Sequence, residues 1–70
     1  MKYVVIIEPT ETGFSAYSPD LPGCVTTSPT REGIEPRMRE AIQLHLEGLR
    51  EEGEEIPVLV SDSILIEIAA

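Results

Sequence analysis

The chain is 70 residues long, which corresponds to one domain near the lower size limit for independent folding. Its single cysteine, Cys24, excludes an intrachain disulfide, and Cys24 and His45 together provide too few soft ligands for a zinc site. We therefore expect no metal and no cofactor, and oligomerisation remains as the aid to stability that such a small domain needs.

Thirteen acidic residues outnumber five basic ones, which gives the chain a formal net charge of −8. Such a surface repels nucleic acid, because nonspecific binding depends on Lys and Arg contacts to phosphate. It attracts a basic protein through long-range electrostatic steering. Acidic composition also serves solubility alone, so charge by itself leaves both interpretations open.

The longest uninterrupted apolar run, residues 4–7, is far too short to span a membrane, and no basic segment precedes an apolar leader. A single thiol is compatible with a reducing compartment. We expect a cytoplasmic protein without a membrane partner.

Residues 2–8 (KYVVIIE) give the strongest strand signal, because they are rich in β-branched side chains and stop at Pro9. Alternation places Val4 and Ile6 on one face and three further apolar residues on the other. Both faces are apolar, which is typical of a strand covered on two sides.

Residues 9–13 form a predicted turn before a second strand at residues 14–18, and the short connection makes the pair an antiparallel hairpin. Residues 19–23 (PDLPG) form a second, stiffer turn, since two prolines restrict the backbone. A third short strand follows at residues 24–28.

An apolar stripe at helical spacing predicts a helix that stops at Gly53. Its members are Ile34, Met38, Ala41, Ile42, His45 and Leu49. Thr30 is a reasonable N-cap, but Pro36 would then lie inside the helix and leave the Glu32 carbonyl without a partner. We favour an irregular turn at residues 30–35 with the regular helix starting at Pro36; a kinked helix from Thr30 is the alternative.

Two apolar patches follow the helix, at residues 58–60 and 64–68, and the second is the better strand. A helical crossover usually joins parallel neighbours, so this fourth strand is expected to lie parallel to the first. The predicted fold is therefore α+β, in the order β-β-β-α-β, within a single domain spanning residues 1–70.

One helix covers only one face of this sheet, although the first strand offers apolar side chains to both. A second copy of the chain is the simplest cover, so we expect a homodimer or a higher homo-oligomer. The residues expected at this interface are Val4, Ile6, Ile64 and Ile66.

The sequence resembles the N-terminal domain of HicB-like antitoxins from residue 1 to about residue 57. The resemblance rests on residues 3–8 (YVVIIE), 13–17 (GFSAY), 19–24 (PDLPGC), 39–42 (REAI) and 45–49 (HLEGL), and on Ile56-Pro57. It implies a partly degenerate ribonuclease H-like fold with three antiparallel strands, a helix and a fourth strand. It also implies a cytoplasmic, non-enzymatic protein that neutralises HicA, a small basic ribonuclease toxin that cuts messenger RNA.

Family members often carry a C-terminal module that binds operator DNA. This chain ends at Ala70, so direct DNA binding is not expected unless another subunit supplies the DNA-binding module. Gly33 and Pro36 also depart from the clean helical start usual in the family.

Two groups of residues are candidates for contact with a partner. The first is the rigid loop tip of Asp20, Leu21 and Pro22, although Leu21 is equally suited to the core. The second is the acidic cluster, which we define as Glu51, Glu52, Glu54 and Glu55; it suits either attraction of a basic toxin or plain solvation.

No catalytic residues are assigned. Cys24 and His45 invite a nucleophile–base interpretation, but no third orienting group is evident and a buried structural cysteine is favoured. A metal-dependent nuclease would need convergent carboxylates, for which Glu8, Asp20, Glu40 and Glu67 are the candidates. The alternatives to an antitoxin are thus an orphan homo-oligomeric domain with another partner and, with less support, this nuclease.

Overall fold

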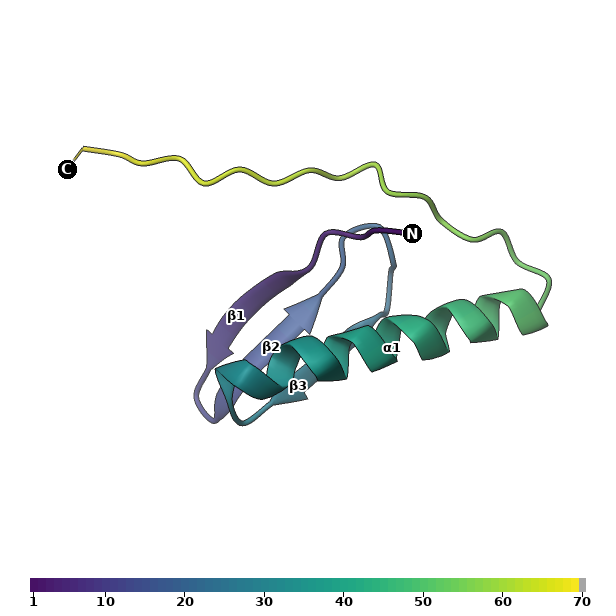
Figure 1. The fold of residues 1–70 in the computed structure, drawn as a ribbon, viewed down its shortest axis with the longest axis horizontal. Coiled ribbons are helices and arrows are strands. Elements are labelled where there is room, and N and C mark those ends of the chain that lie inside the picture. Colours follow the sequence, from purple (N-terminus) through teal and green to yellow (C-terminus); the bar gives the residue numbers. More distant parts are fainter. Residues whose placement is uncertain (70) are drawn as a thin grey trace.

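One antiparallel sheet and one long helix make up the body of the protein (Figure 1). The structure is a computed structural model, and it describes residues 1–69. Strand β1 (Ile6–Thr10) pairs with β2 (Gly13–Tyr17), which pairs in turn with β3 (Val25–Ser28), so the sheet order is β1-β2-β3. Helix α1 (Arg31–Glu51) follows β3. The predicted α+β class and the three antiparallel strands are confirmed.

The first strand begins later than the sequence predicts. Its register pairs Ile6 with Tyr17 and Pro9 with Phe14, and β2 ends at Tyr17. Residues 2–5 therefore extend beyond the end of β2, so they have no strand beside them in the described chain. Pro9 lies within β1, where it is tolerated because β1 is an edge strand of this sheet.

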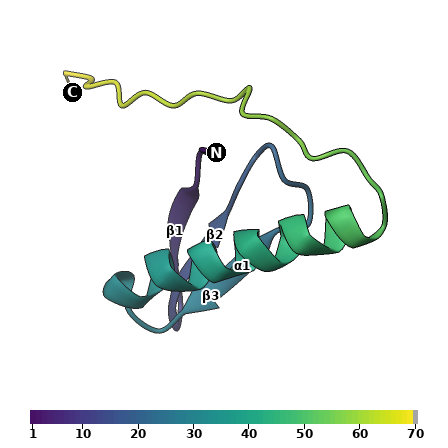
Figure 2. The ribbon, with the colours of Figure 1, turned by 45° about the vertical axis from the view of Figure 1, so that its right-hand side comes forward.

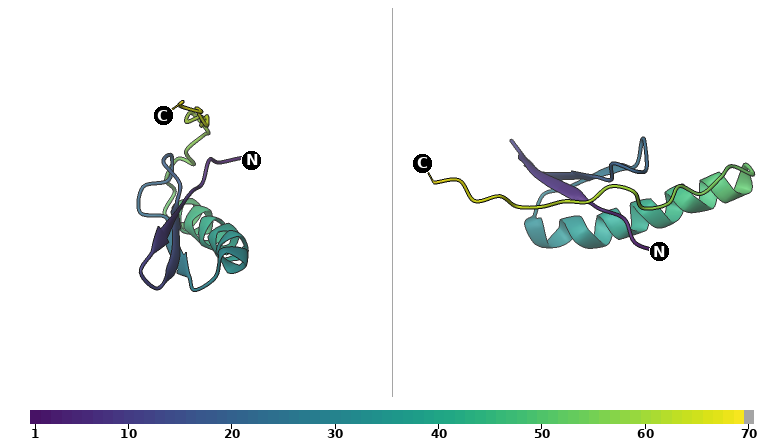
Figure 3. Two further views of the ribbon diagram at one scale, coloured as in Figure 1. Left: turned by 90° about the vertical axis from the view of Figure 1, so that its left-hand side faces the viewer. Right: turned by 90° about the horizontal axis from the view of Figure 1, so that it is seen from above.

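Helix α1 packs on one face of the sheet, mainly across β3 and β2 (Figure 3). The buried core lies between these two layers and consists of Ala16, Leu21, Cys24, Ile34, Met38 and Leu46. Tyr3, Val5 and Ile7 pack against this core from the first strand. Alternation along the strand then places Val4 and Ile6 on the opposite face, as the sequence predicted.

The helix begins at Arg31, so the favoured start at Pro36 is wrong. Thr30 is the N-cap, and its Oγ1 accepts a hydrogen bond from the Gly33 amide at 3.1 Å. The first turn forms despite Pro36 because it places Ile34 in the core, and burial of this side chain, which has no exposed surface, stabilises the turn. A Cβ at position 33 would lie 2.6 Å from the Ser28 hydroxyl, so a larger residue there would force the Ser28 side chain to move.

The helix ends as predicted, at the glycine signal. Gly53 adopts a left-handed backbone (φ 69°), and its amide donates to the Arg50 carbonyl at 3.1 Å. The Glu54 amide donates to the Leu49 carbonyl at 2.8 Å, which completes a Schellman-type stop. No helix within residues 1–69 combines the length and the apolar character that a membrane crossing requires.

The predicted fourth strand is not formed within one copy of the chain. Residues 58–69 run as an extended segment that is assigned to no strand, and Figures 1 and 2 show it separated from the sheet. Its composition suits a strand, but a strand also needs a neighbour, and the described chain does not place β1 beside it.

Candidate interaction surfaces

The loop between β2 and β3 holds a fixed shape. The Leu21 amide donates to the Ser18 carbonyl at 3.1 Å, and the Cys24 amide donates to the Leu21 carbonyl at 3.0 Å. The Leu21 side chain is 1% exposed, so the structure places it in the core, which is the second of the two alternatives considered for it. Pro22 remains exposed at the loop tip.

The Asp20 carboxylate holds the C-terminal segment against this loop. Its Oδ2 accepts hydrogen bonds from the amides of Val60 (3.1 Å) and Ser61 (3.0 Å), and its Oδ1 accepts one from the Ser61 hydroxyl (2.9 Å). The hydrogen bond from the Ser61 amide is the main reason that the pKa of Asp20 lies below its ordinary value. We call these three hydrogen bonds the Asp20 clasp.

A second anchor lies just before the clasp, where the Tyr3 hydroxyl donates to the Pro57 carbonyl oxygen. Asp20 is a partner-binding candidate by its place in the loop, and the sequence does not indicate this intramolecular role. The clasp joins residues 40 and 41 positions apart, and its amide donors carry no sequence signal because every non-proline residue has one.

We expect the Asp20 clasp to depend on pH in one direction. The pKa of Asp20 is lowered in the folded chain, so the clasp is fully formed above the ordinary pKa of 3.8 and is lost as the pH falls through the lowered folded value. At neutral pH, Asp20→Ala should raise amide hydrogen exchange at Val60 and Ser61 by at least about tenfold, because it removes their acceptor. Asp62→Ala is the matched control.

In that control, the one hydrogen bond that the Asp62 side chain accepts among residues 1–69 comes from the adjacent Ser63 amide, at 2.8 Å. Exchange at Val60 and Ser61 should therefore stay unchanged. Equal exchange at these two amides in the wild type and in Asp20→Ala would show that the clasp does not hold the segment.

The acidic cluster lies where α1 ends and the chain reverses. All four glutamates are exposed. Among residues 1–69 the one salt bridge joins Arg39 to Glu35 at 3.9 Å, so the cluster keeps its negative charge. This charge lies at the carbonyl end of the helix, where it opposes the helix dipole and costs some stability. The cluster is thus an unneutralised anionic surface at one end of the molecule.

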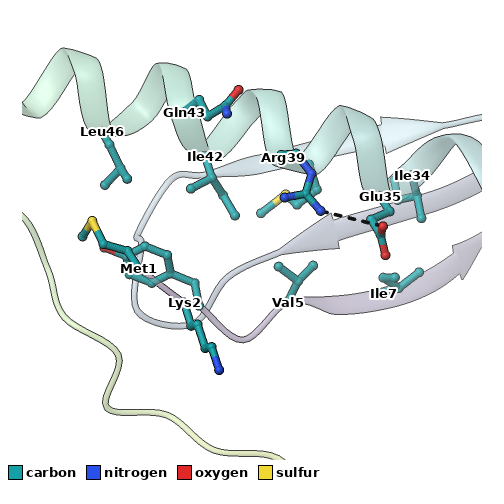
Figure 4. Close-up of a pocket in the computed structure, with 12 residues that line it drawn as sticks. Met1, Lys2, Val5, Ile7, Ile34, Glu35, Arg39, Ile42, Gln43 and Leu46 are labelled. Carbon is teal, nitrogen blue, oxygen red and sulfur yellow. Dashed lines mark ion pairs between the residues drawn. The ribbon is translucent and has the colours of Figure 1, made fainter.

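An apolar groove of about 620 Å³ runs between the first strand and α1 (Figure 4). It exists because α1 packs across β3 and β2 and leaves the inner side of β1 uncovered. Val5 and Ile7 line one wall, and Ile42 and Leu46 line the other. Sequence analysis missed this groove, because the helical stripe shows which residues turn inward but not how far across the sheet the helix lies.

The face of the sheet away from α1 carries its own apolar group. The register places Ile6 beside Tyr17, and Tyr17 beside Val25. Tyr17 is 41% exposed and Val25 is 61% exposed, whereas Val4 and Ile6 are half-buried. The interface role predicted for Val4 and Ile6 stays a prediction, with their position on the uncovered face in its favour.

The residues considered for catalysis are not assembled into a site. Cys24 is a buried member of the core, and its burial raises the pKa of the thiol, which disfavours the reactive thiolate. Within the part of the chain that the structure describes, no three His, Cys, Asp or Glu side chains gather as a metal site would require. Glu8, Glu40 and Glu67 therefore do not converge with Asp20, which is occupied by the C-terminal segment.

Comparison with known proteins places this fold in a family. The family model described as HicB-like antitoxin of bacterial toxin-antitoxin system matches residues 3–67. The chain belongs to the HicB-like antitoxin family. The match extends ten residues beyond the end of the resemblance noted from the sequence, so the HicB-like region includes the exposed C-terminal segment.

Curated relatives of this HicB-like domain include an archaeal and a phage protein. A UPF0150 protein from Thermoplasma acidophilum is 40% identical over 58 residues, which cover 81% of this chain and 84% of that protein. An uncharacterised 14.9 kDa protein of Haemophilus phage HP1 is 37% identical over 57 residues. The HicB-like domain spans only 43% of the phage protein's length.

A solved structure shares the fold. The HicB-like domain superposes with a TM-score of 0.76 on a chain of the structure described as the HicA3 and HicB3 toxin-antitoxin complex. The two sequences are 35% identical, and the match covers 86% of this chain and 70% of the other. Membership of this family supports an antitoxin role.

Proposed function

We propose that this HicB-like domain binds a basic HicA-type ribonuclease toxin in the cytoplasm and blocks its cleavage of messenger RNA. The observation that supports this most strongly is the match to a chain of a solved HicA3 and HicB3 toxin-antitoxin complex. The domain acts by covering the toxin's surface and carries out no reaction of its own.

The charge of the chain suits such a partner. A ribonuclease must hold RNA phosphates with cationic side chains, and those side chains are complementary to a protein of net charge −8. The acidic cluster concentrates four of the thirteen carboxylates at the end of α1. Carboxylates that occupy the phosphate positions of the toxin would exclude RNA by direct competition, and they would also speed the encounter.

The exposed side chain of Pro22 lies on a loop whose shape is already fixed by hydrogen bonds and by the buried Leu21. Such a loop loses little conformational freedom when a partner binds. We propose Pro22 as a secondary contact and assign Leu21 and Asp20 the supporting role of holding the loop and the C-terminal segment in place.

Co-expression with a basic HicA-type ribonuclease toxin tests the proposal. The toxin alone should arrest growth, and the HicB-like domain should restore growth and co-purify with the toxin in a complex that weakens as salt rises. Growth arrest that persists although both proteins accumulate in folded form would refute the proposal. It would favour the alternative function, an oligomeric HicB-like domain that serves another protein or ligand.

A further inference from the structure

The C-terminal segment leaves the body of the protein as an extended apolar segment, and among residues 1–69 no strand pairs with it. The Asp20 clasp holds the segment at Val60 and Ser61. Beyond Ser61 the segment runs away from the sheet and the helix (Figures 1 and 3). We call residues 62–68 the arm. Four large apolar side chains of the arm face water, namely Ile64 (81% exposed), Leu65 (100%), Ile66 (71%) and Ile68 (75%). A contiguous run of exposed apolar side chains such as this one is typical of an interaction site.

The free edge of β1 offers a place for such a strand. β1 pairs with β2 on one side only, and residues 2–5 continue its path beyond the end of β2. The backbone of an edge strand presents a row of N–H and C=O groups that an added strand can pair with. An extended segment laid along this edge would extend the sheet from three strands to four.

The side chains of an added strand would enter the groove described above. Strand residues alternate between faces, so Ile64, Ile66 and Ile68 share one face and Leu65 and Glu67 share the other. The groove has apolar walls and a volume of about 620 Å³, which accommodates three isoleucine side chains. Its lining also includes two cations, Lys2 and Arg39, and one carboxylate, Glu35, whereas the arm carries Asp62 on the same face as its three isoleucines. The volume, polarity and charge of the groove therefore suit the isoleucine face of the arm.

The arm does not reach this groove in its own copy. The anchors at Pro57 and Ser61 fix its direction, and its exposed side chains show that it lies on neither β1 nor α1. We propose that the arm adds as a strand to the free β1 edge of a second copy of the chain, with Ile64, Ile66 and Ile68 in that copy's groove. The exchange is reciprocal, because each copy has one arm and one groove, and reciprocal exchange gives a closed twofold dimer.

This arrangement is more specific than a dimer formed through the uncovered face of the sheet. It assigns the missing fourth strand to the partner copy and gives Ile64 and Ile66 defined positions. Exchange of the arm does not require that the domain inhibits a toxin. The proposed strand exchange and the proposed toxin binding can therefore be tested independently.

Sedimentation equilibrium of the full chain at neutral pH tests the exchange. The wild type should be a dimer, and Ile64→Asp/Ile66→Asp should weaken dimerisation by at least about 100-fold, since it puts two charges into an apolar groove. Leu44→Asp is the control, because Leu44 is 58% exposed on α1 and does not line the groove. Dimerisation of that variant should change by less than about threefold. Circular dichroism confirms that α1 is intact in both variants.

Isotope-filtered NMR on an equal mixture of labelled and unlabelled wild-type chains separates the two routes by which the arm can be buried. Contacts between the isoleucine methyls of the arm and those of Val5 or Ile42 should connect different copies. Three results would overturn the proposal: a monomeric wild type, arm contacts confined to one copy, or a dimer that survives Ile64→Asp/Ile66→Asp unchanged.

Discussion

Ile34→Ala is expected to unfold a large fraction of the molecules at 37 °C. Ile34 has no exposed surface, and it lies in the first turns of α1 against the sheet. Truncation of a fully buried isoleucine to alanine typically costs roughly 2–5 kcal/mol, as lost burial and as a residual cavity. A domain of this size rarely has more than about 3–5 kcal/mol of stability to lose.

Urea denaturation followed by circular dichroism measures this effect. Leu44→Ala is the matched control on the same helix, and its free energy of unfolding should change by no more than about 0.5 kcal/mol because Leu44 is exposed. If Ile34→Ala lowered the free energy of unfolding by less than about 1 kcal/mol, the helix start at Arg31 and the core built on it would be in error.

Among substitutions of exposed residues, neutralising the acidic cluster should weaken binding to the proposed toxin the most. We expect the variant Glu51→Gln/Glu52→Gln/Glu54→Gln/Glu55→Gln to bind the basic toxin about 10- to 100-fold more weakly at low salt, mainly through slower association. Unfolding would not explain the loss, because removing negative charge from the carbonyl end of α1 relieves an unfavourable dipole interaction.

The control for this variant changes the same amount of charge elsewhere. Glu8→Gln/Glu11→Gln/Glu32→Gln/Glu40→Gln also removes four exposed carboxylates, none of them in the acidic cluster. Its affinity for the toxin should fall by less than about threefold, and the difference between the two variants should shrink at high salt. Equal losses would mean that overall charge, rather than the acidic cluster, attracts the toxin.

Local signals in the sequence predicted the antiparallel pairing of the hairpin, and they predicted the second strand, the third strand and the end of the helix to within one or two residues. Each depends on neighbours in the chain. The short turn, which the structure narrows from the predicted residues 9–13 to residues 11–12, fixes the pairing of β1 with β2, and Gly53 supplies the left-handed angle that stops α1. The limits of β1 were less predictable, because they depend on where β2 ends at Tyr17. The apolar character of residues 2–5 is the same whether or not a strand lies beside them.

The start of the helix could not be predicted because two local preferences conflict. Pro36 disfavours a helix that begins at Thr30, whereas the threonine cap favours it. Burial of Ile34 decides between them, and that burial is a property of the packed domain. Because α1 does begin at Arg31, the packing of its first turns, with Ile34 fully buried, outweighs the local cost of Pro36.

The sequence showed which residues have the chemical character of a contact surface, but not where the fold places their side chains. The acidic cluster was evident as a run of charge, and the structure leaves it exposed at the helix end. Asp20 and Leu21 looked like contact residues because they lie in a rigid loop, yet one holds residues 60–61 and the other fills the core. The strand propensity of residues 64–68 was also evident, but propensity does not tell which molecule supplies the neighbouring strand.

Inhibition of RNA cleavage tests the central functional claim most directly. A fixed amount of a basic HicA-type toxin is incubated with labelled RNA, and the purified full chain is added in increasing amounts. We predict that cleavage falls to background at about one equivalent of the HicB-like domain, as expected for tight binding. Cleavage that continues at its initial rate with about a tenfold excess of the folded domain would contradict the account.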